Sequence, residues 1–176
     1  MIGVRPQKLP PEEPVQLQTA ISEAVPRSLP KGIPFPQADD LQKVIDLADV
    51  VAQGITDKEE IAELFEYDPR QSDYYGNAAA FLGLVDRTAR GFIPNPTLSP
   101  FVHKTHAERI SDIASRLSSL PVFREALDAL AAGQLLSREG TADLIQTETG
   151  LRGTTPSRRA LTVQSWVQWI QQATIQ

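Results

Sequence analysis

Hydroxyl and guanidinium side chains cluster around the start of one expected helix near the end of the chain. The cluster contains Arg152, Thr154, Thr155, Ser157, Arg158 and Arg159. Such side chains donate hydrogen bonds to phosphate oxygens, and a helix start adds unpaired backbone N–H groups. Thr155 is expected to cap the helix, with Pro156 in the first helical position, where a missing N–H costs nothing. The spacing therefore predicts a helix start suited to phosphate binding.

The remainder of that helix, to about residue 172, has an apolar face. Its apolar positions recur three or four residues apart and are Leu161, Val163, Trp166, Val167 and Ile170. Trp169 lies beside them, and we expect both tryptophans to pack in the core rather than to stack on nucleic-acid bases. A polar start followed by a buried end is the layout of the recognition helix of a helix-turn-helix.

A second helix start has similar chemistry. Asp68 is expected to cap a helix over 69–82, with Pro69 in its first position. It offers Arg70, Gln71, Tyr74, Tyr75 and Asn77, and an expected β-hairpin over 84–94 adds Arg87 and Arg90. Arginine, glutamine and asparagine can pair with base edges in the major groove, while tyrosine can contact phosphates. Alternatively, a tyrosine lies in the core, Asn77 is an ordinary surface residue, and Arg159 pairs with an acid.

An internal repeat relates the two candidate helices. Residues 47–65 resemble residues 127–145, the second copy being one residue longer after its glycine, and each copy precedes a turn and a Pro-initiated helix. Such self-similarity indicates a duplicated structural unit. We therefore expect a mainly α fold of two tandem helix-turn-helix units, the first with a small β-hairpin wing.

The positions of the units follow from the proline pattern and the helix signals. Eight of the 14 prolines fall within residues 1–36, which are expected to form an arm or linker. The first unit is expected over 37–98 and the second over 99–176. Further helices are expected over 15–25, 39–53, 57–65, 106–120, 121–132 and 137–147. A capping box places Thr56 at the cap of the helix over 57–65, with Glu59 three residues later.

Composition limits the class of protein. The chain has 176 residues, 41% hydrophobic, and lacks cysteine, which excludes disulfides and thiolate metal sites and fits the cytoplasm. No apolar run approaches the ~20 residues that span a bilayer, so no membrane partner is expected. The net charge is −5, yet residues 151–176 contain no acid and three arginines. A local basic patch matters more for nucleic-acid binding than the total charge.

No active site is apparent, and no cofactor or metal is expected. The acids fall on outward faces of capped helices rather than in a Mg²⁺-binding nuclease cluster. His103 and His106 are three residues apart, with no third histidine and no cysteine to complete a zinc site.

Three segments carry a resemblance to a known family: IPFPQADDLQKVIDL (33–47), PRQSDYYGNAAAFLGLVDR (69–87) and TTPSRRALTVQSWVQWI (154–170). Together they resemble a tandem winged-helix region of bacterial type II restriction endonucleases and related restriction–modification proteins. The resemblance implies a non-catalytic module for double-stranded DNA, attached to a nuclease domain or acting alone, that would associate with the nucleoid. Arg70, Gln71, Tyr74, Tyr75, Asn77, Thr155, Ser157, Arg158 and Arg159 would face DNA. The alternatives are a transcriptional regulator and a protein–protein or homodimerisation module.

Overall fold

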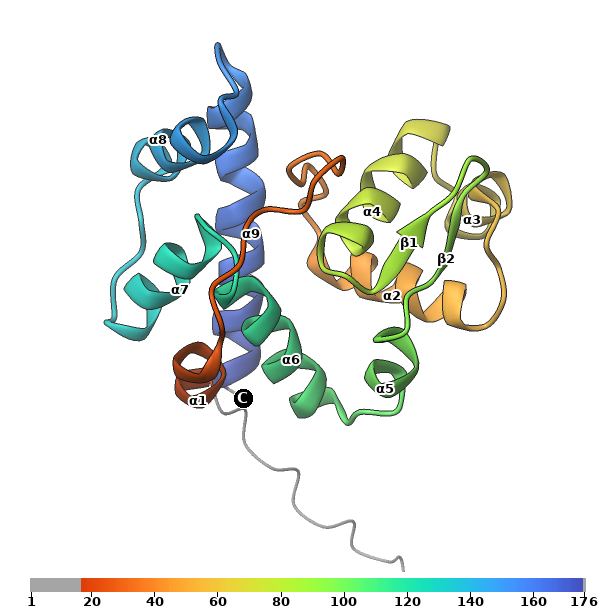
Figure 1. The fold of residues 1–176 in the computed structure, drawn as a ribbon, viewed down its shortest axis with the longest axis horizontal. Helices are drawn as coiled ribbons and strands as arrows, with labels where there is room; N and C mark the ends of the chain where they lie inside the picture. The colour runs from red at the N-terminus through yellow and green to blue at the C-terminus, as the bar shows by residue number, and fades with distance from the viewer. Residues whose placement is uncertain (1–16, 176) are drawn as a thin grey trace, which may run out of the picture.

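The computed structural model describes residues 17–175, which fold mainly as α-helices with a small antiparallel β-sheet (Figure 1). In chain order the elements are α1 (Leu17–Glu23), α2 (Leu41–Ala52), α3 (Lys58–Phe65), α4 (Pro69–Phe81), β1 (Val85–Arg87), β2 (Phe92–Pro94), α5 (Leu98–Val102), α6 (His106–Ser118), α7 (Phe123–Ala131), α8 (Arg138–Thr149) and α9 (Thr155–Ile175). None of the helices within this part of the chain is long and apolar enough to cross a membrane.

The first repeat comprises α2, α3 and α4, followed by the hairpin of β1 and β2. Helix α4 packs against both preceding helices and against β1. The strands pair with Val85 opposite Pro94 and Arg87 opposite Phe92. Just before β2, Gly91 forms an isolated antiparallel bridge with Asp57, the residue before α3. The hairpin is therefore tied to the α2–α3 connection as well as to α4.

The second repeat comprises α7, α8 and α9. The 21-residue α9 packs along α8 and α7, as α4 packs on α3 and α2. Gly54 and Gly133 follow the first helix of each repeat with φ of +100° and +77°. These left-handed conformations suit glycine and end both helices in the same way. Helix α1 packs against α6 and α7.

One hydrophobic core runs through both repeats. Phe35 stands at its centre, with ring centroids 5.6 Å from Phe81 of α4 and 5.7 Å from Phe123 of α7. Phe123 in turn stacks on Trp166 of α9 at 5.4 Å. Trp166 is fully buried and Trp169 lies half-buried against the core, so the prediction of core tryptophans is confirmed.

Phe35 belongs to an extended segment between α1 and α2, residues 24–40, which we name the strap. The strap runs beside α9 before it enters α2, and is the red-to-orange segment in Figure 1. Three side chains of α9 hold it. Arg159 donates to the Oε1 of Gln37, Thr162 donates to Asp39 at 2.6 Å, and Trp166 donates to the carbonyl oxygen of Ala38 at 2.7 Å. Their spacing along α9 places all three on one face of the helix.

Two of the predicted caps are wrong by one residue. Asp57, not Thr56, caps α3, because its carboxylate accepts from the backbone N–H of Glu59 at 2.8 Å. Helix α9 already includes Thr155, and the amide of Arg158 donates to the carbonyl of Thr154, so Thr154 precedes the helix. The Asp68–Pro69 start of α4 is confirmed, with Gln71 completing a capping box.

Helix α5 was not expected, because its surroundings, residues 94–100, contain three prolines. Pro100 lies in the first turn of α5, where the missing N–H would have no intrahelical partner in any case.

Candidate nucleic-acid interface

The N-terminal ends of α4 and α9 point to the same edge of the molecule, the upper edge in Figure 1. Each is the third helix of its repeat, and the strap passes between the two. The predicted site residues near α9 lie just before the helix or in its first turns, whereas those on α4 extend from its first turn to its third. The structure thus brings the two predicted helix starts to one side of the molecule.

On α4, the predicted residues divide into exposed and packed ones. Arg70 and Gln71 are exposed, and Tyr74 is 36% exposed. The Oε1 of Gln71 accepts from the backbone N–H of Asp68, which leaves its amide nitrogen available to another acceptor. Asn77 is half-buried and lines a cleft of about 460 Å³ between α4 and the hairpin.

Tyr75 is the member of the predicted set that faces away from this side. It is half-buried, and its ring stacks on Tyr67 with centroids 5.2 Å apart. Burial raises its pKa, and the negative charge of Asp40 raises it further. The structure therefore places Tyr75 in the packing between α4 and the α3–α4 turn rather than beside Tyr74.

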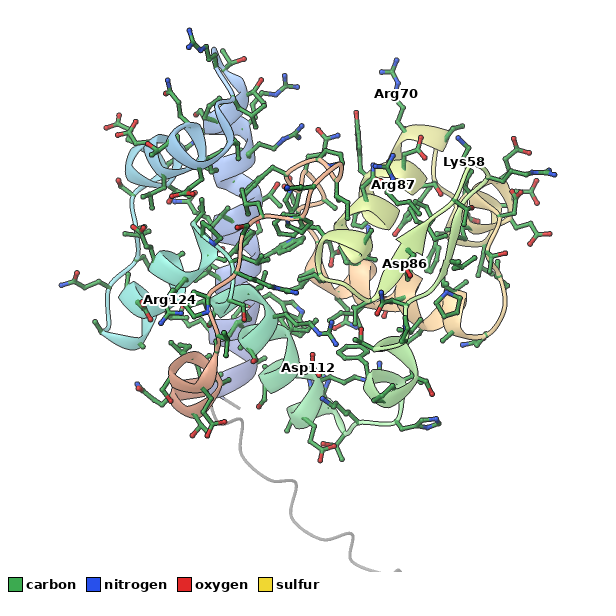
Figure 2. All side chains as sticks on the ribbon, in the orientation of Figure 1. Lys58, Arg70, Asp86, Arg87, Asp112 and Arg124 are labelled. Carbon is green, nitrogen blue, oxygen red and sulfur yellow. The ribbon has the colours of Figure 1, made fainter. Side chains whose placement is uncertain are left out.

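The hairpin contributes two exposed arginines. The guanidinium of Arg87 donates to the carbonyl oxygen of Gly32 in the strap at 2.8 Å, and Arg87 also lines the cleft. Arg90 lies at the tip, 88% exposed and 3.7 Å from Asp57. Arg87 and Lys58 both line the cleft, and Figure 2 shows Arg70 extending outward from the start of α4.

Two glycines allow the hairpin to sit this close to the helices. A Cβ on Gly76 of α4 would lie 2.0 Å from the ring of Phe92, and a Cβ on Gly91 would lie 1.9 Å from the carbonyl oxygen of Thr56. Both approaches require the absence of a side chain. The interior glycine of α4, unfavourable for a helix, is thus explained by the docking of β2.

The start of α9 carries the second group. Arg152, Thr154 and Arg158 are exposed, while Thr155 and Ser157 are half-buried. Arg138, the first residue of α8, donates from its Nε to the carbonyl of Ser157 at 3.2 Å. Arg138 therefore extends this basic group, although the prediction from the sequence did not include it.

Lys58 is the second residue that the prediction missed, and the repeat could have identified both. Lys58 and Arg138 are the first residues of α3 and α8, and they occupy equivalent positions in the two copies. Each lies beside the third helix of its repeat. Lys58 lines the cleft and is 3.9 Å from Asp73 of α4.

Arg159 lies between the two groups and does not pair with an acid. Its side chain is half-buried, one terminal nitrogen donates to Gln37, and its Nε is buried with no hydrogen-bond partner among the described residues. Burial lowers the pKa of Arg159, and the positive charge of Arg158 lowers it further, while Tyr74 and Asp39 partly oppose this. Tyr74 of α4 lines the same cleft as Gln37, the residue to which Arg159 donates.

Cations without a carboxylate partner gather on this side. Within residues 17–175, the lysines and arginines with no carboxylate oxygen within 4.0 Å are Arg27, Lys31, Arg70, Arg87, Arg138, Arg152, Arg158 and Arg159. All but Arg27 and Lys31 of the strap belong to the candidate site. By contrast, Arg109 and Arg116 of α6 are bound to Asp49 and Asp112.

This arrangement can bind anions and polar edges. Guanidinium groups that are not neutralised attract phosphates, and Asn77 and Gln71 have amide groups that match base edges. Among residues 17–175, no three histidine or acidic side chains form a group that could hold a metal ion.

Comparison with known proteins gives one match. Residues 43–175 match a family described as a domain of unknown function, DUF7226. No curated protein and no solved structure is significantly similar to the chain. The match begins inside α2 and continues to the end of α9, so both repeats and the hairpin fall within it. The chain belongs to the DUF7226 family.

Proposed function

We propose that this chain is a non-catalytic module that recognises double-stranded DNA, with α4 and α9 as its two recognition helices. The observation that carries the proposal is the gathering of cations without carboxylate partners at the starts of these helices. In a chain with a net charge of −5, these arginines provide the local positive potential that attracts a polyanion.

The helix arrangement supports two tandem helix-turn-helix units, the first of them winged. Residues 66–68 form a three-residue turn between α3 and α4, and the hairpin follows α4 as a wing would. The bridge from Asp57 to Gly91 adds a third strand-like contact to that hairpin. The corresponding turn in the second repeat, residues 150–154, is longer and contains two left-handed glycines, Gly150 and Gly153.

The exposed residues would have different roles. Arg70, Arg87 and Arg158 would hold phosphates, because they are exposed and no acid among residues 17–175 pairs with them. The free amide of Gln71 and the side chain of Asn77 would contact base edges. Phosphate contacts give affinity and position the protein, whereas base contacts give sequence preference.

The resemblance to restriction–modification proteins supports a more specific setting. In that setting the chain would provide DNA recognition to a nuclease domain, in the same polypeptide or in a partner, or would act as a homodimer. A methyltransferase gene beside the gene for this chain would support this setting, and its absence would favour a transcriptional regulator.

Fluorescence anisotropy of a labelled duplex, measured over a series of salt concentrations, tests DNA binding directly. Arg158→Ala and Arg70→Ala should each weaken binding and reduce the slope of log K against log salt by about 0.9, the contribution of one phosphate contact. Arg27→Ala is the matched control, because Arg27 is also exposed and without a carboxylate partner but lies on the strap near α6. The assignment of α4 and α9 as recognition helices would be contradicted if both variants kept the wild-type salt slope. It would also be contradicted if Arg27→Ala weakened DNA binding equally.

A second candidate function is a protein–protein module, and the exposed face of α3 favours it. Glu59, Glu60 and Glu63 are exposed there, and Leu64 is 54% exposed. This candidate would be supported if the chain binds a protein partner but not DNA, and if Leu64→Lys abolishes that partner binding.

A further inference from the structure

Arg159 presents an unusual combination of burial and missing partners. An arginine side chain has five N–H donors, and a buried guanidinium is costly unless its charge and its donors are satisfied. Arg159 has Gln37 as an uncharged partner, its Nε is buried and unpaired, and no carboxylate oxygen lies within 4.0 Å among the described residues. Because the side chain is only half-buried and Gln37 takes up one terminal nitrogen without neutralising the charge, the charge of Arg159 is left for an acceptor that comes from a ligand.

The position of Gln37 connects Arg159 to the cleft of the first repeat. Gln37 lines the cleft between α4 and the hairpin together with Tyr74, Asn77, Lys58 and Arg87. That cleft has one carboxylate, Asp73, which is 3.9 Å from Lys58. The strap thus holds a guanidinium of the second repeat beside a basic cleft of the first.

We propose that Arg159, oriented by Gln37 at the edge of the cleft that Tyr74 lines, forms a phosphate-binding subsite between the two repeats. The ligand is a backbone phosphate of double-stranded DNA, so this inference rests on the proposed function. The charge of Arg159 and its terminal N–H groups that Gln37 leaves free meet the phosphate, the Tyr74 hydroxyl adds a donor from α4, and Gln37 fixes the guanidinium without neutralising it. One phosphate is then held by both repeats, which fixes how α4 and α9 sit on the duplex relative to one another.

The burial of Arg159 favours this role over that of a general surface cation. A flexible exposed arginine loses side-chain entropy when it binds, whereas a guanidinium already fixed by Gln37 loses less. The separation of roles is clear: Arg159 would touch the phosphate, and Gln37 would act through Arg159 as a positioning residue.

A double-mutant cycle tests the subsite, with duplex binding measured by anisotropy over a series of salt concentrations. Arg159→Gln should weaken binding about tenfold, equally for a random and a selected duplex, and reduce the salt slope by about 0.9. Gln37→Ala should weaken binding about threefold. The double variant should match Arg159→Gln alone, because Gln37 acts through the guanidinium.

Thr162→Ala is the matched control. It removes the neighbouring bond between α9 and the strap, from Thr162 to Asp39, and does not remove either partner of the bond between Arg159 and Gln37. It should lower the melting temperature without changing DNA affinity. Should Arg159→Gln fail to fold, Arg159→Lys keeps the charge and should retain the wild-type salt slope with weaker binding, because it loses the planar fork.

The outcomes separate the two proposals. A wild-type chain whose affinity for duplex does not depend on salt would overturn the proposed function itself. Weaker binding by Arg158→Ala together with unchanged binding by Arg159→Gln would overturn only the subsite. Additive losses in the cycle, or equal losses for Thr162→Ala and Gln37→Ala, would show that Gln37 does not act through Arg159.

Discussion

The indole N–H of Trp166 donates to the carbonyl oxygen of Ala38 at a distance of 2.7 Å, across 128 residues of sequence. Both residues are buried, Trp166 at 0% exposure and Ala38 at 2%. If one of the two polar groups is removed, the other therefore cannot form a hydrogen bond with water instead. This bond anchors the strap to α9 just before the strap enters α2, so it fixes the relative position of the two repeats.

Trp166→Phe should destabilise the protein by about 2–4 kcal/mol. The substitution leaves the Ala38 carbonyl buried and unpaired and opens a small cavity beside Phe123. Urea denaturation followed by circular dichroism measures the effect. Trp169→Phe is the control and should cost less than about 1 kcal/mol, because Trp169 is only half-buried. Equal losses would show that the strap bond contributes little.

The helices could be predicted from the sequence because their start and stop signals are local. Asp68–Pro69 and Thr105 with Glu108 satisfy helix N–H groups within four residues, so the spacing alone locates α4 and α6. The repeat and the hairpin also depend on local patterns: the repeat related the two third helices, and alternating apolar residues around a polar turn located the hairpin. The one-residue errors at Thr56 and Thr155 arose because two adjacent polar residues could each serve as a cap.

The strap and its contact with Arg159 could not be predicted in the same way. Gln37 and Arg159 are 122 residues apart, and no periodicity or motif in either segment indicates the other. The proline-rich composition suggested an arm over 1–36, yet Phe35 packs between the two repeats. The orientation of side chains could not be predicted either. Tyr74 and Tyr75 are neighbours in sequence, but Tyr74 lines the cleft and Tyr75 stacks on Tyr67.

Gly76→Ala should destabilise the protein by about 2 kcal/mol. Alanine favours a helix over glycine by about 1 kcal/mol, but the new Cβ would lie 2.0 Å from the buried ring of Phe92. Thermal melts of the single variants and of Gly76→Ala with Phe92→Leu test the cause. The smaller side chain should relieve the clash, so the double variant should be more stable than the sum of the two losses implies. If the two losses of stability simply add, the loss in Gly76→Ala does not come from a clash with Phe92.

Arg116→Ala should cost about 3 kcal/mol. The terminal nitrogen of Arg116 donates to the carbonyl of Leu82 at 3.0 Å, at the end of α4, while its Nε pairs with Asp112. Both side chains of the ion pair are largely shielded, at 17% and 13% exposure. Lys104 still pairs with the other oxygen of Asp112, but removal of Arg116 leaves one Asp112 oxygen and the Leu82 carbonyl without this donor. Arg124→Ala, which removes a pair at 4.0 Å with a side chain 37% exposed, should change the unfolding free energy by less than about 1 kcal/mol. Urea unfolding measures both variants, and similar losses of unfolding free energy in Arg116→Ala and Arg124→Ala would contradict this ranking.

Alkaline stability should depend on Tyr67, whose ring lies between those of Phe65 and Tyr75. Burial of its hydroxyl raises the pKa of Tyr67 to about 12 from an ordinary value of 10.0, with smaller contributions from Tyr75, Asp40 and Asp46. Because the folded state holds the proton more tightly, stability is fully present below pH 10. It should then fall as the pH rises from 10 through 12.

Tyr67→Phe isolates this contribution. The Tyr67 hydroxyl is buried and has no hydrogen-bond partner among the described residues, so its removal should leave stability at pH 7 unchanged or slightly higher. The decline between pH 10 and 12 should become shallower, while Tyr75, whose pKa is also raised, retains part of it. Urea unfolding at fixed pH values from 7 to about 12 measures both effects. An identical decline in the variant would mean that other groups cause the alkaline loss.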